Sequence, residues 1–358
     1  MSHALSSPRF ERVDLTKIDS FGTDASRHGL FQSGAWLAFL AEVQNAEPVA
    51  AILTDGSQDL GRFAGLIVRR WGFRFLGSPL PGWTTPYMGF DLRPGVPRRL
   101  AATALVDFAF RELRCAHLEL RDRWLGENDV DELGFGRRRD VGYDDRTFEI
   151  DLRRSEDELF GRMESACRRC IRQADKRGLV VEEATEISFA DEFYAQLSEV
   201  FLRQGLVPTY GVERVRALIR HLQPAGQLLL LRARDAEGRG IATGIYPAFG
   251  ETALFWGGAS LRAHQHNRPN EALHWYAMRY WKRRGVIRYD LGGFMEYKRK
   301  YGGDEVTIPG FRLSRSPIIS ALRTLAPRGM RTKQLVVGRL RQRQLLAPSE
   351  SPVAAAGD

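Results

Sequence analysis

The stretch RYDLGGFMEYKRKYGG, residues 288–303, decides how this 358-residue chain is interpreted. It follows a segment, residues 269–284, whose apolar and aromatic side chains recur at the spacing of one helical face. The apolar run at 286–291 then predicts a buried strand. Gly292 and Gly293 allow the backbone to turn, or to approach a ligand more closely than a Cβ would permit. The order of helix, strand, double glycine and aromatic-basic cluster predicts a binding site at a strand end.

This stretch resembles a motif of the Fem family of aminoacyl-tRNA-dependent transferases, which share the GNAT fold with related acetyltransferase-like proteins. In that family a D-L-G-G-like turn precedes an aromatic-Lys-x-x-aromatic-Gly element, here residues 290–293 and 297–302. A second resemblance is RTFEIDL, residues 146–152, which leads into a basic helix. The resemblance implies a mixed α/β fold of two tandem GNAT-like domains, each a central mixed sheet flanked by helices.

We expect the first domain to span residues 1–150 and the second to span 151–312. Residues 313–358 are expected to form a basic C-terminal segment that partly returns to the first domain and ends in disorder. The second domain is predicted to contain helices at 155–177, 189–204, 211–222 and 269–284, a hairpin at 227–246, and strands at 252–257 and 286–291.

Positive charge is concentrated in two places. Residues 315–358 carry eight basic and two acidic side chains, a net charge of +6 within a total of +9. In the predicted helix 155–177, Arg168, Arg172 and Lys176 recur every four residues and should form a basic ridge. Arginine binds phosphate through two parallel hydrogen bonds. Both segments predict a phosphate-bearing partner, and the alternative is that they are solvated charges without one.

Lys298 is the main candidate for catalysis. If an amine attacks an activated acyl carbonyl, a nearby cation stabilises the negative charge that develops on the carbonyl oxygen; the resemblance also implies that this lysine holds a terminal phosphate. Asp290 is expected either to orient the amine or to accept a hydrogen bond from the following turn, and Tyr297 flanks the lysine. The candidates for substrate binding are Arg168, Arg172, Lys176, Arg203, Tyr210, Tyr301, Gly292 and Gly293.

The resemblance implies that the enzyme needs no bound cofactor and takes an aminoacyl-tRNA as co-substrate and partner. The acceptor would be the amine of a peptide, a peptidyl carrier or a cell-wall precursor. One alternative is an acyl-CoA-dependent N- or O-acyltransferase. Residues 262–270, RAHQHNRPN, contain no glycine, whereas enzymes of this fold that use acyl-CoA bind pyrophosphate on a glycine-containing loop at a helix N-terminus. The other alternative is a non-catalytic binding protein with the same fold.

Several other classes are not favoured by the sequence. Cys167 and Cys170 form a C-x-x-C pair, but no second pair of ligands accompanies it, so we expect no metal site. The chain has no phosphate-binding glycine motif and no G-x-S-x-G nucleophile turn. No run approaches the ~20 apolar residues of a membrane span. The first residues lack a secretory signal, so we expect a cytoplasmic protein. The sequence does not indicate an oligomeric state.

Overall fold

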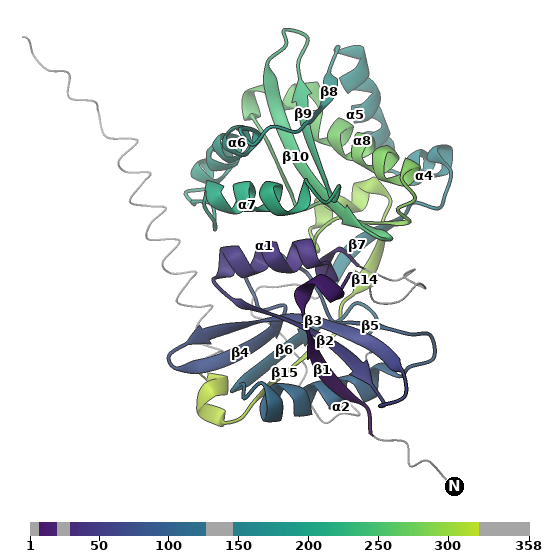
Figure 1. Ribbon diagram of the computed structural model, residues 1–358. Coiled ribbons are helices and arrows are strands. Elements are labelled where there is room, and N and C mark those ends of the chain that lie inside the picture. Colours follow the sequence, from purple (N-terminus) through teal and green to yellow (C-terminus); the bar gives the residue numbers. More distant parts are fainter. Residues whose placement is uncertain (1–6, 20–28, 127–145, 322–358) are drawn as a thin grey trace, which may run out of the picture.

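The computed structural model describes residues 7–19, 29–126 and 146–321, which form two mixed sheets flanked by helices (Figure 1). We call the two units the first and second modules. The first sheet has the strand order β1-β2-β3-β4-β6-β15, and β5 pairs with β3. Its strands are β1 (Arg9–Val13), β2 (Glu47–Thr54), β3 (Asp59–Arg70), β4 (Phe73–Ser78), β5 (Phe90–Leu92), β6 (His117–Arg121) and β15 (Gly310–Ser314).

The second sheet has the strand order β14-β7-β13-β11-β10-β9-β8, and β12 pairs with β10. Its strands are β7 (Arg146–Asp151), β8 (Val180–Ala184), β9 (Leu228–Arg234), β10 (Gly240–Phe249), β11 (Thr252–Leu254), β12 (Gly257–Ser260), β13 (Arg288–Asp290) and β14 (Asp304–Thr307). The structure therefore has the mixed α/β class and the two-unit arrangement that the sequence predicts.

Each module contains one parallel strand pair with a helix between the two strands in the sequence. In the first module β4 runs parallel to β6, and α2 (Arg98–Asp107) lies between them. In the second module β11 runs parallel to β13, and α8 (Pro269–Arg283) lies between them. Because the carboxyl ends of parallel strands meet at one edge of a sheet, each pair brings together the residues at its carboxyl end.

Three apolar clusters hold the helices on the sheets. One lies between α2 and the first sheet, and a second lies between the second sheet and helices α5 (Ser165–Lys176) and α8. The third joins the modules, because α1 (Gly34–Gln44) contributes Trp36 and α7 (Val212–Leu222) contributes Leu218 (Figure 1). The other helical segments are α4 (Glu156–Arg162), α6 (Phe189–Arg203), η4 (Arg262–Asn267), η5 (Glu296–Tyr301), Leu15–Lys17, Leu30–Gln32 and Phe108–Glu112.

The sheets divide at different residues from the predicted domain boundaries. The strand β7 lies wholly in the second sheet, although the predicted boundary at residue 150 crosses it. The strand β15 pairs with β6 and buries Phe311 in the first core, so the chain returns to the first module before residue 313. Residues 322–358, which include most of the basic C-terminal segment, lie outside the described residues.

The predicted helix 155–177 is two helices, α4 and α5. The chain leaves the helical conformation at Met163 and Glu164. The guanidinium group of Arg168 donates hydrogen bonds to the carbonyl oxygens of Gly161 and Met163, which lose their helical partners at this break. The predicted strand 252–257 is likewise divided into β11 and β12.

Candidate active site

The segment Asp290–Gly293, which we call the DLGG loop, is tied to its own strand end and to β7. Asp290 Oδ1 accepts hydrogen bonds from the backbone N–H of Gly292 at 2.7 Å and from Thr147 Oγ1 at 2.5 Å. Thr147 Oγ1 in turn accepts from the N–H of Gly293 at 3.0 Å. A Cβ on Gly292, where φ is +75°, would lie 2.5 Å from the carbonyl oxygen of Phe255. The loop conformation therefore requires glycine there.

Lys298 lies behind the DLGG loop. Its Nζ donates to the carbonyl oxygens of Leu291, Gly292 and Gly293 at 2.6, 2.9 and 3.3 Å. Burial lowers the pKa of Lys298 to about 8, and the negative charge of Asp290 opposes that shift. Because an ammonium group has three donors, the three carbonyls use all of them. In the structure Lys298 holds the loop through these bonds, and its predicted contact with the acyl group stays a prediction.

Asp290 carries a buried carboxylate oxygen without a partner. Its side chain is fully buried, and among the described residues Oδ2 has no hydrogen-bond donor. Desolvation raises the pKa of Asp290 to about 6, and the negative charge of Glu149 adds to the shift. Glu149 itself pairs with Arg123 at 2.6 and 2.8 Å. Of the two predicted roles, acceptance of a hydrogen bond from the turn is observed for Oδ1.

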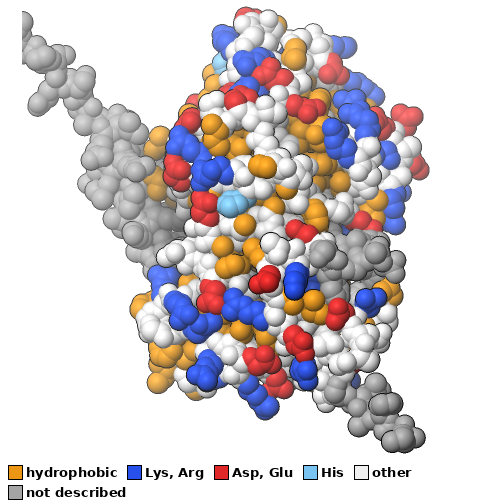
Figure 2. Space-filling view, in the orientation of Figure 1, with side chains coloured by type: hydrophobic (Ala, Val, Ile, Leu, Met, Phe, Trp, Pro, Cys, Tyr) orange, Lys and Arg blue, Asp and Glu red, His pale blue; other side chains and the backbone are white. Residues whose placement is uncertain are grey.

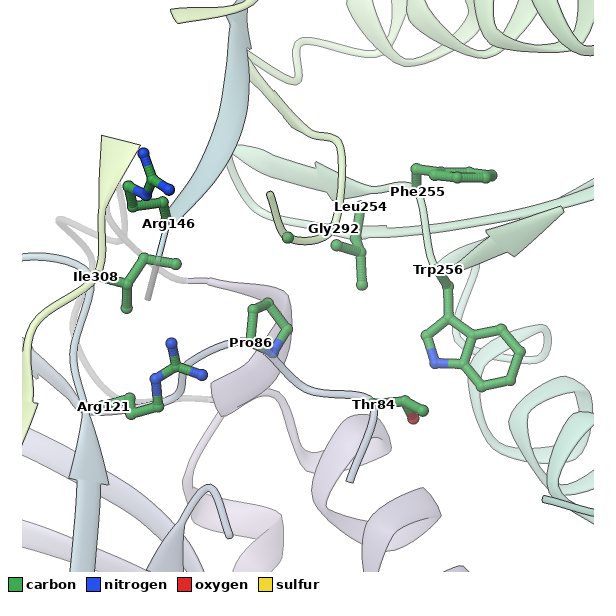
Figure 3. Close-up of a pocket in the computed structure, with 10 residues that line it drawn as sticks. Thr84, Pro86, Arg121, Arg146, Leu254, Phe255, Trp256, Gly292 and Ile308 are labelled. Atoms are coloured by element: carbon green, nitrogen blue, oxygen red, sulfur yellow. The ribbon is translucent and has the colours of Figure 1, made fainter. Parts of the chain in front are cut away.

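A cavity of about 150 Å³ lies between the modules, beside the DLGG loop (Figure 3). It is lined by Thr84, Pro86, Arg121, Arg146, Leu254, Phe255, Trp256, Gly292, Gly293 and Ile308. The two arginines come from the end of β6 and the start of β7 and lie on one side, while Trp256 lies on the other. The cavity thus combines cationic, aromatic and backbone groups from both modules.

The polar groups of this cavity differ in how they are held. Arg121 is buried, whereas the guanidinium group of Arg146 lies 3.8 Å from the ring centroid of Phe294 and pairs with Glu305 at 2.5 Å. The indole Nε1 of Trp256 is buried and has no hydrogen-bond acceptor among the described residues. The N–H groups of Gly292 and Gly293 already donate to Asp290 Oδ1 and Thr147 Oγ1. The indole N–H of Trp256 is therefore a donor that a bound substrate can meet, and the two guanidinium groups supply positive charge to the cavity.

The other predicted residues lie at different distances from the cavity. Gly292 and Gly293 line it. Tyr210 extends the wall at Trp256, since their ring centroids are 5.4 Å apart. Tyr297 is 53% exposed on η5, whereas Tyr301 is buried against His274 at a centroid distance of 4.3 Å. The structure therefore does not bring Tyr297 and Tyr301 to the cavity lining.

The predicted basic residues lie outside the cavity. Arg168, Arg172 and Lys176 are on α5, on the outer side of the second module (Figure 1). Arg168 is turned back to the end of α4 by its bonds to backbone carbonyls. Arg203, in the last turn of α6, pairs with Glu199 on the same helix. These positions separate the basic residues from the DLGG loop.

Sequence reasoning missed Arg121, Arg146 and Trp256. Each had a local signal: Arg121 ends a strand, as Asp290 does, Arg146 begins the quoted RTFEIDL strand, and Trp256 precedes a double glycine. Only the fold shows that these three positions, far apart in the chain, line one cavity.

The parallel pair of the second module opens beyond Leu254. The N–H of Phe255 still donates to the carbonyl of Asp290 at 2.8 Å, but the next strand, β12, pairs with β10 instead. Three rings pack beside this opening at inclined angles, since the centroids of Phe255 and Tyr301 lie 4.4 and 4.3 Å from that of His274. Burial lowers the pKa of His274 to about 3, and the charges of Lys298 and Lys300 lower it further. A neutral aromatic cluster thus lies next to the opening.

Comparison with known proteins identifies part of the chain. Residues 161–299 match the family model of the acetyltransferase (GNAT) domain. The matched segment forms most of the second module, which therefore resembles a GNAT domain. This match confirms the predicted superfamily and supports an acyltransferase. No curated protein matches the sequence.

Solved structures extend the likeness over both modules of the protein. FemX is 14% identical, with a TM-score of 0.70 over 88% of this chain and 100% of that chain. The C-terminal domain of a putative lysylphosphatidylglycerol synthetase from Agrobacterium fabrum is 11% identical, with a TM-score of 0.53 over 87% and 95%. A tandem GNAT protein from the clavulanic acid biosynthesis pathway is 13% identical, with a TM-score of 0.50 over 87% and 99%. These identities show a shared fold.

Two further observations concern the described part of the protein. No helix there is long and apolar enough to cross a membrane. Within the same residues, no group of three or more His, Cys, Asp or Glu side chains is placed to hold a metal ion.

Proposed function

We propose that the protein joins an activated acyl group to an amine in the cavity between its modules, with aminoacyl-tRNA as the acyl donor and a peptide or peptidoglycan-like molecule as acceptor. One observation carries this proposal: the DLGG loop of the GNAT domain and two arginines at the module junction line the same cavity. A cavity shared by two modules suits a reaction that must hold two substrates together, because proximity and orientation lower the barrier of a bimolecular step.

The chemistry of the cavity suits direct attack of the amine on the acyl carbonyl. The carbonyl oxygen gains negative charge as the carbon–nitrogen bond forms, and a donor aimed at that oxygen lowers the barrier. Trp256 Nε1, which has no acceptor among the described residues, is the candidate donor. Arg121 and Arg146 suit an anionic group of the acceptor, since guanidinium binds carboxylate and phosphate in a fixed geometry.

Two features favour aminoacyl-tRNA over acyl-CoA. The segment before α8 forms η4 and then reaches Pro269 through Arg268, whose φ is +60°, so no glycine loop precedes the helix. The Fem-type motif of the DLGG loop points in the same direction. Acyl-CoA remains the alternative donor.

The test is a transfer assay with purified protein and amine-bearing acceptors. A mixture of radiolabelled aminoacyl-tRNAs is supplied in one arm and radiolabelled acetyl-CoA in the other. We expect label to move from the tRNA to the acceptor. Transfer from acetyl-CoA alone would replace the donor in this proposal. Transfer from neither donor, with tight binding of a candidate acceptor, would favour a non-catalytic binding protein.

A further inference from the structure

A row of two adjacent aromatic rings with an arginine at each end lies on the outer side of the GNAT domain. The guanidinium group of Arg172 on α5 lies 5.2 Å from the ring centroid of Phe160 on α4. The Phe160 ring lies 5.4 Å from that of Trp275 on α8, and Arg279 lies 5.3 Å from the Trp275 ring. We call these four residues the arginine–aromatic row.

The charges around the row are not neutralised. Arg169, Lys176 and Arg283 are exposed on the same two helices, and Figure 2 shows Lys and Arg side chains gathered over this part of the molecule. Among the described residues, no carboxylate forms an ion pair with these three side chains or with the two arginines of the row. Asp175 is the exposed acidic residue of α5.

Arg232 of the same domain, in contrast, is neutralised by carboxylates. Arg232 on β9 pairs with Glu182, Glu186 and Glu192 at 2.8, 2.7 and 2.6 Å. Three carboxylates around one guanidinium group make a structural cluster that is closed to further anions. The row instead pairs its cations with ring faces, which hold the guanidinium groups in place and leave their positive charge available.

We propose that the arginine–aromatic row and its flanking cations bind RNA, and that this surface receives the tRNA part of the donor; the identity of the donor rests on the proposed function. Aromatic rings stack on bases, and arginines both stack and contact the backbone, without need for a particular sequence. A lipid surface is less suitable, because Phe160 and Trp275 are partly buried against the second core and do not protrude as an apolar anchor.

The helix η5 connects this surface to the candidate active site. Lys300 pairs with Glu271 in the first turn of α8 at 2.7 Å, and its carbonyl oxygen accepts from the N–H of Glu164, which precedes α5, at 3.0 Å. Two residues earlier, Lys298 holds the DLGG loop. RNA bound on the row would thus lie on helices that one short segment joins to the loop.

The test measures the binding of uncharged tRNA by fluorescence anisotropy at low and moderate salt, with full-length protein. We expect Trp275→Ala to weaken binding by about tenfold, the scale of one lost base stack. Arg279→Glu should weaken it at least as much and flatten its salt dependence, whereas Trp275→Phe should keep most of the affinity. Arg70 and Trp71, a matched cation–aromatic pair in the hairpin of the first module, provide the controls Arg70→Glu and Trp71→Ala.

The outcomes separate this inference from the proposed function. Loss of tRNA affinity in the row variants, but not in the controls, supports the surface even if the wild type transfers label only from acetyl-CoA. Transfer from aminoacyl-tRNA that is unchanged in Trp275→Ala and Arg279→Glu would overturn the surface and leave the function standing. Binding of anionic phospholipid vesicles that depends on the row, without tRNA binding, would also overturn it. Arg279→Glu decides the matter if Trp275→Ala fails to fold.

Discussion

The two parallel strand pairs both end at a buried aspartate, and yet the two carboxylates differ in their partners. In the first module Asp122 comes directly after β6, and in the second Asp290 ends β13; both carboxylates are buried, and burial raises the pKa of each. Asp122 accepts from Arg98 Nη1 at 2.6 Å and from the N–H groups of Phe90 and Trp124 at 2.9 and 2.7 Å. Both of its oxygens are used.

Asp290 is left with one oxygen unpartnered among the described residues, because the nearby cation is used elsewhere. Lys298 donates to three backbone carbonyls of the DLGG loop and forms no ion pair with Asp290, whereas Arg98 bonds directly to Asp122. The partners of Asp122 therefore hold the first strand end together, whereas Asp290 keeps a carboxylate oxygen that has no partner in the described part of the chain beside the cavity. A buried polar group without a partner calls for an explanation; for Asp290 we propose a role at the cavity, which the variants below test.

The largest effect is expected from removing the paired aspartate. Asp122→Ala leaves the guanidinium group of Arg98 and two backbone N–H groups without their partner, which should lower the free energy of unfolding by about 3–5 kcal/mol. Urea unfolding measures it. Asp107→Ala is the control, because that carboxylate is exposed and its pair with Arg111 should contribute less than about 1 kcal/mol. If Asp122→Ala also lowers the free energy of unfolding by less than about 1 kcal/mol, the Asp122 pair has no structural role.

The second largest effect is expected from replacing Lys298, which lies behind the DLGG loop. Lys298→Met keeps the side-chain length but leaves three carbonyl oxygens without a donor, so we expect a loss of about 2–3 kcal/mol in unfolding free energy. We also expect at least about a tenfold fall in kcat/KM, because misplacing the loop disturbs the cavity wall. Thermal melts and the transfer assay measure the two effects, with Arg299→Met, a half-exposed residue of the same helix, as control. Lost turnover at full stability would return Lys298 to the direct catalytic role that the sequence predicts.

The behaviour of Lys298 shows what the sequence could and could not predict. The DLGG loop, its two glycines and the preceding helix follow from local pattern, because spacing and glycine chemistry act within a few residues. The partner of an ammonium group depends instead on which atoms the fold brings within about 3 Å. The three carbonyl groups that accept from Lys298 are close to it in sequence. They became its partners because the fold buries the ammonium group among them.

The position of Arg168 likewise depends on partners that the sequence pattern does not show. A four-residue repeat predicts a basic ridge, but the break between α4 and α5 exposes carbonyl oxygens that draw Arg168 away from it. The cavity was harder to predict from the sequence, because Arg121, Arg146 and Trp256 lie at three separate strand ends that only the tertiary fold brings together. The DLGG loop and the basic helix could be located from the sequence. The hydrogen-bond partners of Lys298 and Arg168 could not.

Trp256→Phe tests whether the indole N–H in the cavity of the second strand end takes part in catalysis. The substitution keeps an aromatic ring beside Tyr210 and removes the indole N–H. If that donor stabilises the oxyanion, kcat should fall by about tenfold or more while KM changes little. Steady-state kinetics with the donor that the wild type uses provide the measurement, and Trp71→Phe on the surface is the control. An increase in KM at constant kcat would assign Trp256 to substrate binding alone.

The smallest change, and the one that addresses the comparison most directly, is Asp290→Asn. The amide keeps an oxygen that can accept from Gly292 and Thr147, so stability at low pH should change by less than about 1 kcal/mol. The pKa of Asp290 is raised from 3.8 to about 6 in the folded protein, so its protonated form is favoured by folding. That contribution is complete below pH 3.8 and is lost as the pH rises through 6. The variant cannot ionise there, and its stability should therefore gain on the wild type between these pH values. Urea unfolding across this range tests the difference, and parallel pH profiles would mean that Asp290 has a partner for its charge, as Asp122 does.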